Sequence, residues 1–273
     1  DIYYAGASVL LYERDFYDLT MAYFAHCAEE NVVHTEIMFD PQTHTKRGVS
    51  FETVIKGIQK AREDAKEKYG ISSLLIMSYL RHLSEEDAFE TLEQLLPYKH
   101  LIKAVGLDSS EKGNPPSKFQ KVFEASIKEG YVPVAHAGEE GPAEYIWEAL
   151  DLLKISRIDH GNNCLTDEVL IKKLVDEKIA LTVCPLSNLE LKVVDDLKDH
   201  PLKKMLNLGL KATVNSDDPA YFGGYMNANF LQTAEALDLT QEEIKTLVKN
   251  SFEYSFLSDD EKQKYLIQVE NFE

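Results

Sequence analysis

Short apolar runs of strand length recur along the chain and alternate with longer amphipathic segments. Seven such runs occupy residues 32–39, 72–80, 101–107, 131–136, 156–160, 179–184 and 210–216. Strands that alternate with helices at this spacing predict βαβ units and a parallel sheet, and this number of strands favours a barrel over an open sheet. Pro133 weakens one assignment, because proline donates no hydrogen bond to a sheet.

Capping signals mark several of the helices between these strands. Ser84, Thr240 and Ser258 each precede an acidic residue three positions later, which predicts a capping box at a helix start. Apolar stripes with helical spacing follow Pro142 and precede Gly130. The elements therefore predict an α/β protein, and no linker or low-complexity segment divides the chain.

A closed barrel of the (β/α)₈ TIM type needs eight strands. No further strand-like run follows residue 216, so we expect the first strand to be absent from this chain and to lie before Asp1. Residues 1–273 are then expected to form a single, N-terminally truncated barrel domain. This length is ordinary for an α/β barrel with one core.

Polar side chains gather where four successive predicted strands end. They are His136 with Glu139, then Asp159 with His160, then Cys184, and finally Asp217 with Asp218. Each alone has a structural interpretation as a turn former, a helix cap or a small buried thiol. Functional residues of barrels lie at the C-terminal ends of the strands, so the repetition favours one shared site.

Histidine nitrogen and carboxylate oxygen are suitable ligands for Zn²⁺. A catalytic zinc also keeps one position open for water, whose pKa it lowers towards neutrality. His136 and Asp217 would supply two ligands, which is too few for a tight site. The ligand set therefore looks truncated, and we expect the missing ligands to lie in the absent first strand.

Composition narrows the range of partners. The chain has 47 acidic and 29 basic residues, and its net charge of -18 disfavours nucleic acid and anionic membrane surfaces. No run is long and apolar enough to span a bilayer. The charge favours a small-molecule substrate instead. The 3 cysteines form no CxxC pair and no secretory signal is visible, which predicts a cytoplasmic protein. The oligomeric state is not predicted.

Four segments carry a specific family resemblance. The segments "HAGE", "IDHG", "CPLSN" and "NSDDPAYFGGY", in this order and on these strands, resemble the adenosine/adenine deaminase family of zinc-dependent amidohydrolase-like barrels. The longer stretches "FDPQTHTKRGVSF" and "VNSDDPAYFGGYMNANF" look like the adenine deaminase branch. The resemblance covers essentially the whole chain. The family's first strand carries a His-x-His pair of zinc ligands that nothing here matches. The resemblance therefore implies one Zn²⁺ per chain, with two further histidine ligands upstream of residue 1.

The resemblance implies a role for each matched residue. His136 and Asp217 correspond to the third and fourth zinc ligands. Glu139 corresponds to the proton donor to purine N1, His160 to the residue that orients and deprotonates the water, and Asp218 to the group that contacts N7. A general acid is required because attack at C6 breaks aromaticity, so the ring nitrogen must be protonated as the nucleophile arrives.

The implied activity is zinc-dependent hydrolytic deamination of adenine to hypoxanthine and ammonia, in purine salvage and nucleotide metabolism. Ser109, in the segment "DSSEKG", is a further candidate for contact with the purine edge. One alternative is an adenosine deaminase. Another is a non-catalytic barrel, if the upstream ligands are truly missing. For this chain alone, the incomplete ligand set predicts weak metal retention and little activity.

Overall fold

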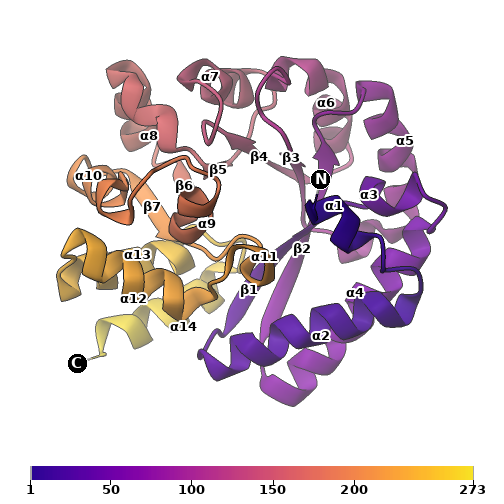
Figure 1. The fold of residues 1–273 in the computed structure, drawn as a ribbon, viewed down its shortest axis with the longest axis horizontal. Coiled ribbons are helices and arrows are strands. Elements are labelled where there is room, and N and C mark those ends of the chain that lie inside the picture. Colours follow the sequence, from indigo (N-terminus) through magenta and orange to yellow (C-terminus); the bar gives the residue numbers. More distant parts are fainter. Residues whose placement is uncertain (1, 273) are drawn as a thin grey trace. The chain divides into compact units, whose positions relative to one another are not determined.

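The fold alternates parallel strands with helices. The computed structural model describes residues 2–272 (Figure 1). Its strands are β1 (His34–Phe39), β2 (Ser72–Leu80), β3 (Ala104–Asp108), β4 (Val132–Ala137), β5 (Arg157–His160), β6 (Ala180–Val183) and β7 (Lys211–Val214). Each strand falls within or at the edge of a predicted run, so all seven strand predictions are confirmed.

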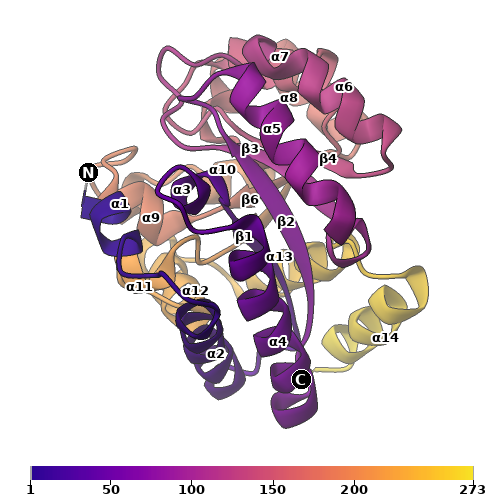
Figure 2. The same ribbon diagram turned by 90° about the vertical axis from the view of Figure 1, so that its right-hand side faces the viewer.

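Helices follow the strands and also lie at both ends of the chain (Figures 1 and 2). They are α1 (Ile2–Ala7), α2 (Glu13–Glu29), α3 (Gln42–Thr45), α4 (Phe51–Tyr69), α5 (Glu85–Leu95), α6 (Gln120–Lys128), α7 (Ala143–Asp151), α8 (Glu168–Asp176), α9 (Pro185–Glu190), α10 (Leu202–Asn207), α11 (Pro219–Phe222), α12 (Met226–Leu237), α13 (Gln241–Glu253) and α14 (Asp259–Glu270). Within the described residues, none of these helices combines the length and the apolar character that a membrane crossing needs.

The strands are hydrogen-bonded in sequence order from β1 to β7, and every neighbouring pair is parallel. Pro133 lies inside β4, which resolves the objection raised by the sequence. Its partner is Val105 of β3, and the register between β3 and β4 ends at this pair. Proline has no N–H to donate, which accounts for the short ladder at this point.

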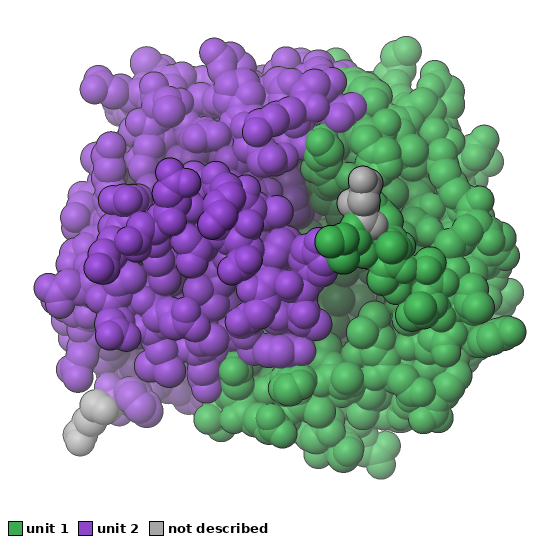
Figure 3. All heavy atoms as spheres, viewed as in Figure 1, with its two compact units in different colours: residues 1–110, 118–133 green, residues 111–117, 134–273 purple. Residues whose placement is uncertain are grey.

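The described residues pack as two compact units (Figure 3). Unit 1 contains the residues up to Ser110 together with Lys118–Pro133, and unit 2 contains Glu111–Ser117 and the residues from Val134 onwards. The single domain over residues 1–273 stays a prediction, and Asp1 and Glu273 lie outside the described residues.

Each unit has its own apolar packing. In unit 1, α2 and α4 lie side by side, and Phe24, Cys27 and Ala65 are buried in a cluster there (Figure 1). In unit 2, α13 packs on β7, and the buried Asn250 side chain donates to the carbonyl oxygen of Ala212 over 2.8 Å. A buried amide that satisfies a strand carbonyl fixes the position of the helix on the strand.

The predicted helix starts are confirmed by their caps. Ser84, Thr240 and Ser258 each accept a hydrogen bond from the backbone N–H three residues later. The carboxylate of the acidic residue at that later position accepts a hydrogen bond from the backbone N–H of the serine or threonine. These reciprocal bonds satisfy backbone donors that a helix N-terminus otherwise leaves open. Pro142 stands one position before α7, as its N-cap residue.

A single carboxylate anchors the loop that follows β4. Glu111 is 2% exposed, and its Oε1 accepts from the N–H of Gly138 over 2.6 Å. Its Oε2 accepts from the N–H groups of residues 139, 140 and 141 at 3.0, 2.9 and 2.8 Å. A Cβ on Gly141 would lie 2.7 Å from the Glu111 carboxyl carbon, so glycine lets this loop approach the carboxylate. The loop carries Glu139, whose backbone is thereby fixed.

We predict a graded loss of stability at Glu111. Alanine removes the acceptor of all four backbone N–H groups and is expected to lower the free energy of unfolding by about 2–4 kcal/mol. Glutamine keeps one acceptor oxygen and should cost roughly half as much. Urea unfolding measures both. The control is Glu177→Gln, an exposed i,i+4 partner of Lys173, for which a change below about 0.5 kcal/mol is expected. Equal stability of Glu111→Ala and the unmodified protein would contradict the role of Glu111.

Candidate active site

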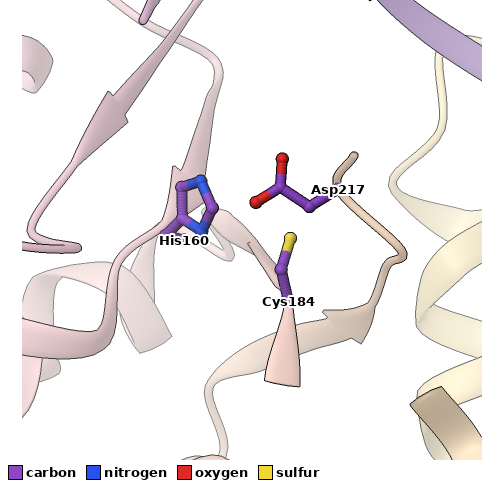
Figure 4. Close-up of side chains that lie close together, drawn as sticks. All are labelled: His160, Cys184 and Asp217. Atoms are coloured by element: carbon purple, nitrogen blue, oxygen red, sulfur yellow. The ribbon is translucent and has the colours of Figure 1, made fainter. Parts of the chain in front are cut away.

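Three side chains of the types that can bind a metal converge from successive strand ends of unit 2. His160 is the last residue of β5, Cys184 follows β6, and Asp217 follows β7. One potential ligand atom from each lies within 4.8 Å of the other two, and Figure 4 shows the side chains pointing towards one another. Nitrogen, sulfur and carboxylate oxygen are donors that Zn²⁺ accepts. The predicted gathering of strand ends is therefore present for these three residues.

His136 of β4 lies beside this cluster. Its ring centroid is 4.6 Å from that of His160, and its Nδ1 is 3.5 Å from Oδ2 of the buried Asp159. Burial lowers the pKa of His136, but the interaction with Asp159, together with the charges of Asp217 and Glu139, raises that pKa to about 9. A carboxylate at Nδ1 leaves Nε2 as the ring nitrogen available for a metal, a common arrangement around bound zinc.

Two site residues have a left-handed backbone. The φ angles of His160 and Asp217 are +66° and +56°, and Ser109 of unit 1 has a φ of +74°. Such conformations cost about 1–3 kcal/mol each for residues other than glycine and persist where the surrounding structure enforces them. They turn the chain sharply at the strand end, which aims the His160 and Asp217 side chains at the cluster (Figure 4).

Glu139 lies next to the cluster with its carboxylate largely buried. Its Oε1 is 3.3 Å from Nδ1 of His160 and accepts a hydrogen bond from Nδ2 of Asn188 over 3.1 Å. Burial raises the pKa of Glu139; the nearby His160 and His136 lower it, and Asp217 and Glu111 raise it, with a net increase. A carboxyl group with a raised pKa can hold a proton nearer to neutral pH, as a general acid must.

The segment after β6 orients the other site residues. Ser187 donates from its hydroxyl to Oδ2 of Asp217 over 2.6 Å, which fixes the carboxylate. Cys184 is buried as predicted, and burial together with the charges of Asp217 and Glu139 raises the pKa of its thiol well above the usual value. A thiol that keeps its proton is a weaker ligand than imidazole or carboxylate, so Cys184 fits the wall of the site better than the metal itself.

The donor set is chemically compatible with a divalent ion. A half-buried histidine next to a carboxylate and an aspartate held by a serine hydroxyl are both pre-oriented. Such supporting contacts are characteristic of metal centres in proteins. The charge of an ion would also favour loss of the proton that Asp159 stabilises on His136, since ligands bind in their deprotonated forms.

The remaining predicted residues are placed as follows. Asp218 stands directly after Asp217 and is the N-cap residue of α11, with a half-buried side chain. Ser109 belongs to unit 1, where its hydroxyl is 2.8 Å from both the Tyr4 hydroxyl and Nδ1 of His82. The purine-binding roles of Asp218 and Ser109 stay predictions.

Sequence reasoning assigned no role to three residues that organise the site. Glu111 holds the loop of Glu139, Ser187 holds Asp217, and Asn188 contacts Glu139. For Ser187 and Asn188 a signal was present, because both are polar in the first turn after a strand end. Glu111 gave no local signal, since its partners lie 27 to 30 residues further along the chain.

Solved structures share this fold. An adenine deaminase from Arthrobacter aurescens superposes with a TM-score of 0.97 at 50% identity, over 99% of this chain and 83% of that one. A cog1816 amidohydrolase from Burkhoderia ambifaria, solved with bound Zn, has a TM-score of 0.89 at 24% identity, over 95% of this chain and 73% of that one. These likenesses confirm the predicted fold class, the TIM-type barrel of the amidohydrolase kind.

Curated relatives agree with the structures. The adenine deaminase of Acinetobacter baylyi is 64% identical over 98% of this chain and 81% of its own length. That of Psychrobacter cryohalolentis is 61% identical over 99% of this chain and 81% of its own length. The family model described as adenosine deaminase matches residues 1–272. The resemblance noted in the sequence is thus confirmed, and the chain belongs to the adenosine deaminase family.

Proposed function

We propose that this protein hydrolyses adenine to hypoxanthine and ammonia, with Glu139 as the general acid and His160 as the group that handles the proton of the attacking water. The contact between Oε1 of Glu139 and Nδ1 of His160, 3.3 Å long, carries the proposal. It joins a carboxyl group of raised pKa to a histidine beside the candidate metal ligands. Hydrolytic deamination needs an acid to protonate the ring, a base to take a proton from water and a metal to activate that water.

The substrate is proposed from the relatives. Eight of them, with identities from 55% to 64%, are named adenine deaminase, and each covers nearly the whole of this chain. The family model itself is described as adenosine deaminase, which keeps the nucleoside as the competing substrate. The net charge of -18 suits an uncharged purine base better than a phosphorylated nucleotide.

We propose one zinc ion, with His136 and Asp217 among its ligands. Asp159 lies at Nδ1 of His136, and the Ser187 hydroxyl donates to the carboxylate of Asp217. When bound, the ion supplies Lewis acidity that makes water nucleophilic near neutral pH. The remaining chemistry depends on the side chains around it.

In the proposed reaction, His160 takes a proton from water as its oxygen bonds to C6 of adenine. Glu139 gives its proton to N1, so the electron pair of the C6–N1 double bond rests on a protonated nitrogen and not on an anion. His160 next gives the proton it took to the amino group, the C6–N bond breaks and ammonia leaves. The proton that remains on the C6 oxygen passes to the carboxylate of Glu139, which leaves hypoxanthine and restores both side chains. Asp218 would contact the purine at N7.

The preference for adenine is the first prediction of this proposal. We expect kcat/KM for adenine to exceed that for adenosine by about tenfold or more, because a pocket shaped for the free base has no complementary groups for ribose. Loss of absorbance of the 6-amino purine and release of ammonia measure both reactions. The protein assayed includes the two further histidine ligands expected upstream of residue 1, because residues 1–273 alone are expected to have little activity. Faster turnover of adenosine would replace the proposed substrate, and a folded protein inactive on both would favour a non-catalytic barrel.

The role of Glu139 is tested by Glu139→Gln. The amide keeps the shape of the side chain but cannot give up a proton in the same way, so kcat for adenine should fall by about 10²- to 10⁴-fold. The matched control is the neighbouring Glu140→Gln, whose carboxylate approaches Lys112 at the surface and which should keep kcat within about threefold. Equal losses in both variants would contradict the assignment of the acid.

A further inference from the structure

A buried amide connects the candidate acid to a histidine outside the site. Asn188 of α9 is fully buried, and its Nδ2 donates to Oε1 of Glu139 over 3.1 Å. Its Oδ1 accepts from Nδ2 of Asn162 over 2.7 Å and is 3.2 Å from Nε2 of His200. These hydrogen bonds link His200 to Glu139 through Asn188, and all three residues lie within unit 2.

The tautomer of His200 follows from its second contact. Nδ1 of His200 accepts a hydrogen bond from the backbone N–H of Leu202 over 3.2 Å. A ring nitrogen that accepts cannot carry the proton, so the neutral ring carries it on Nε2. Burial lowers the pKa of His200 to about 4, so the ring stays neutral at working pH. Nε2–H therefore donates to Asn188 Oδ1.

These donors determine the orientation of the Asn188 amide. Its oxygen must face the N–H groups of His200 and Asn162, because an amide nitrogen at that position would oppose two donors. The amide nitrogen is consequently directed at Glu139. A flip of this amide would place its oxygen against the carboxylate oxygen of Glu139, which is unfavourable in a buried site.

We propose that His200, acting through Asn188, is a positioning residue that determines which oxygen of the Glu139 acid carries the transferable proton. Oε1 is approached by Nδ2 of Asn188 and by Nδ1 of His160. A proton on Oε1 would oppose the Asn188 N–H, so the acid proton resides on Oε2. The hydrogen bonds from His200 through Asn188 thus leave Oε2 of Glu139 as the oxygen that donates the proton to N1 of the purine. The inference rests on the proposed function of Glu139.

The direct test compares two His200 variants. His200→Leu removes the donor to Asn188 and should lower kcat for adenine by about 10- to 100-fold with KM changed less than about twofold. His200→Gln offers a side-chain N–H to the same oxygen and should keep kcat within about threefold. The control is His26→Leu on the surface of α2, which should change neither constant.

A rise in KM with unchanged kcat, or equal losses in the leucine and glutamine variants, would overturn the proposal. If His200→Leu unfolds, Asn188→Asp provides the same comparison, since it keeps the shape but replaces the N–H that faces Glu139 by an oxygen. A fall in kcat at unchanged KM supports the proposal, and unchanged kcat contradicts it. Adenine turnover by the unmodified protein shows separately whether the proposed function holds.

An independent measurement needs no activity. Nitrogen-15 NMR of histidine-labelled protein distinguishes the two neutral tautomers of an imidazole ring, and His200→Gln assigns the signal. The expected result is the Nε2–H tautomer, unchanged between pH 6 and 8, because burial holds the pKa of His200 near 4. An Nδ1–H tautomer, or a ring that titrates in this range, would contradict the inference.

Discussion

The site depends on one buried carboxylate. Glu111 accepts hydrogen bonds from the four backbone N–H groups of residues 138–141. These bonds fix a loop without regular structure and so fix the backbone of Glu139. Asn163 contacts the acceptors of the same loop, because its Nδ2 donates to the carbonyl oxygens of Glu139 and Gly141. Four N–H donors and two carbonyl acceptors of the loop backbone are thus satisfied, as buried backbone groups require. A residue fixed in this way needs no reorganisation when the substrate binds, which suits the general acid that we propose Glu139 to be.

The segment "CPLSN" serves the site from a second direction. It begins α9 after β6, and its first turn places the Ser187 hydroxyl on Asp217 and the Asn188 amide on Glu139. One short helix thereby orients both a candidate metal ligand and the candidate acid. Pro185 occupies the start of α9, where its missing N–H removes no helical hydrogen bond. The left-handed backbone of Asp217 completes the arrangement by turning that side chain towards the same place.

Strands and helix starts were predictable because they follow from local patterns. Apolar runs, capping residues and the polar groups at strand ends are visible within a few positions of one another. Contacts across long sequence separations were not predictable, as with Glu111, which acts on residues 138–141, and His200, which acts through Asn188. Sequence analysis assigned no role to His200, because nothing in its immediate sequence indicates a link to Glu139. The assignment of His136 and Asp217 as ligands came from the donor types at the strand ends and was matched by the family resemblance, and it stays a proposal.

The most direct test of the central claim is a crystal structure of the protein with a bound purine, measured at the zinc absorption edge. The account predicts an anomalous peak within about 2.3 Å of a His136 nitrogen and an Asp217 oxygen, with Glu139 against N1 of the purine. A peak bound instead by Cys184 away from His136, or a purine with no contact to Glu139, would contradict it.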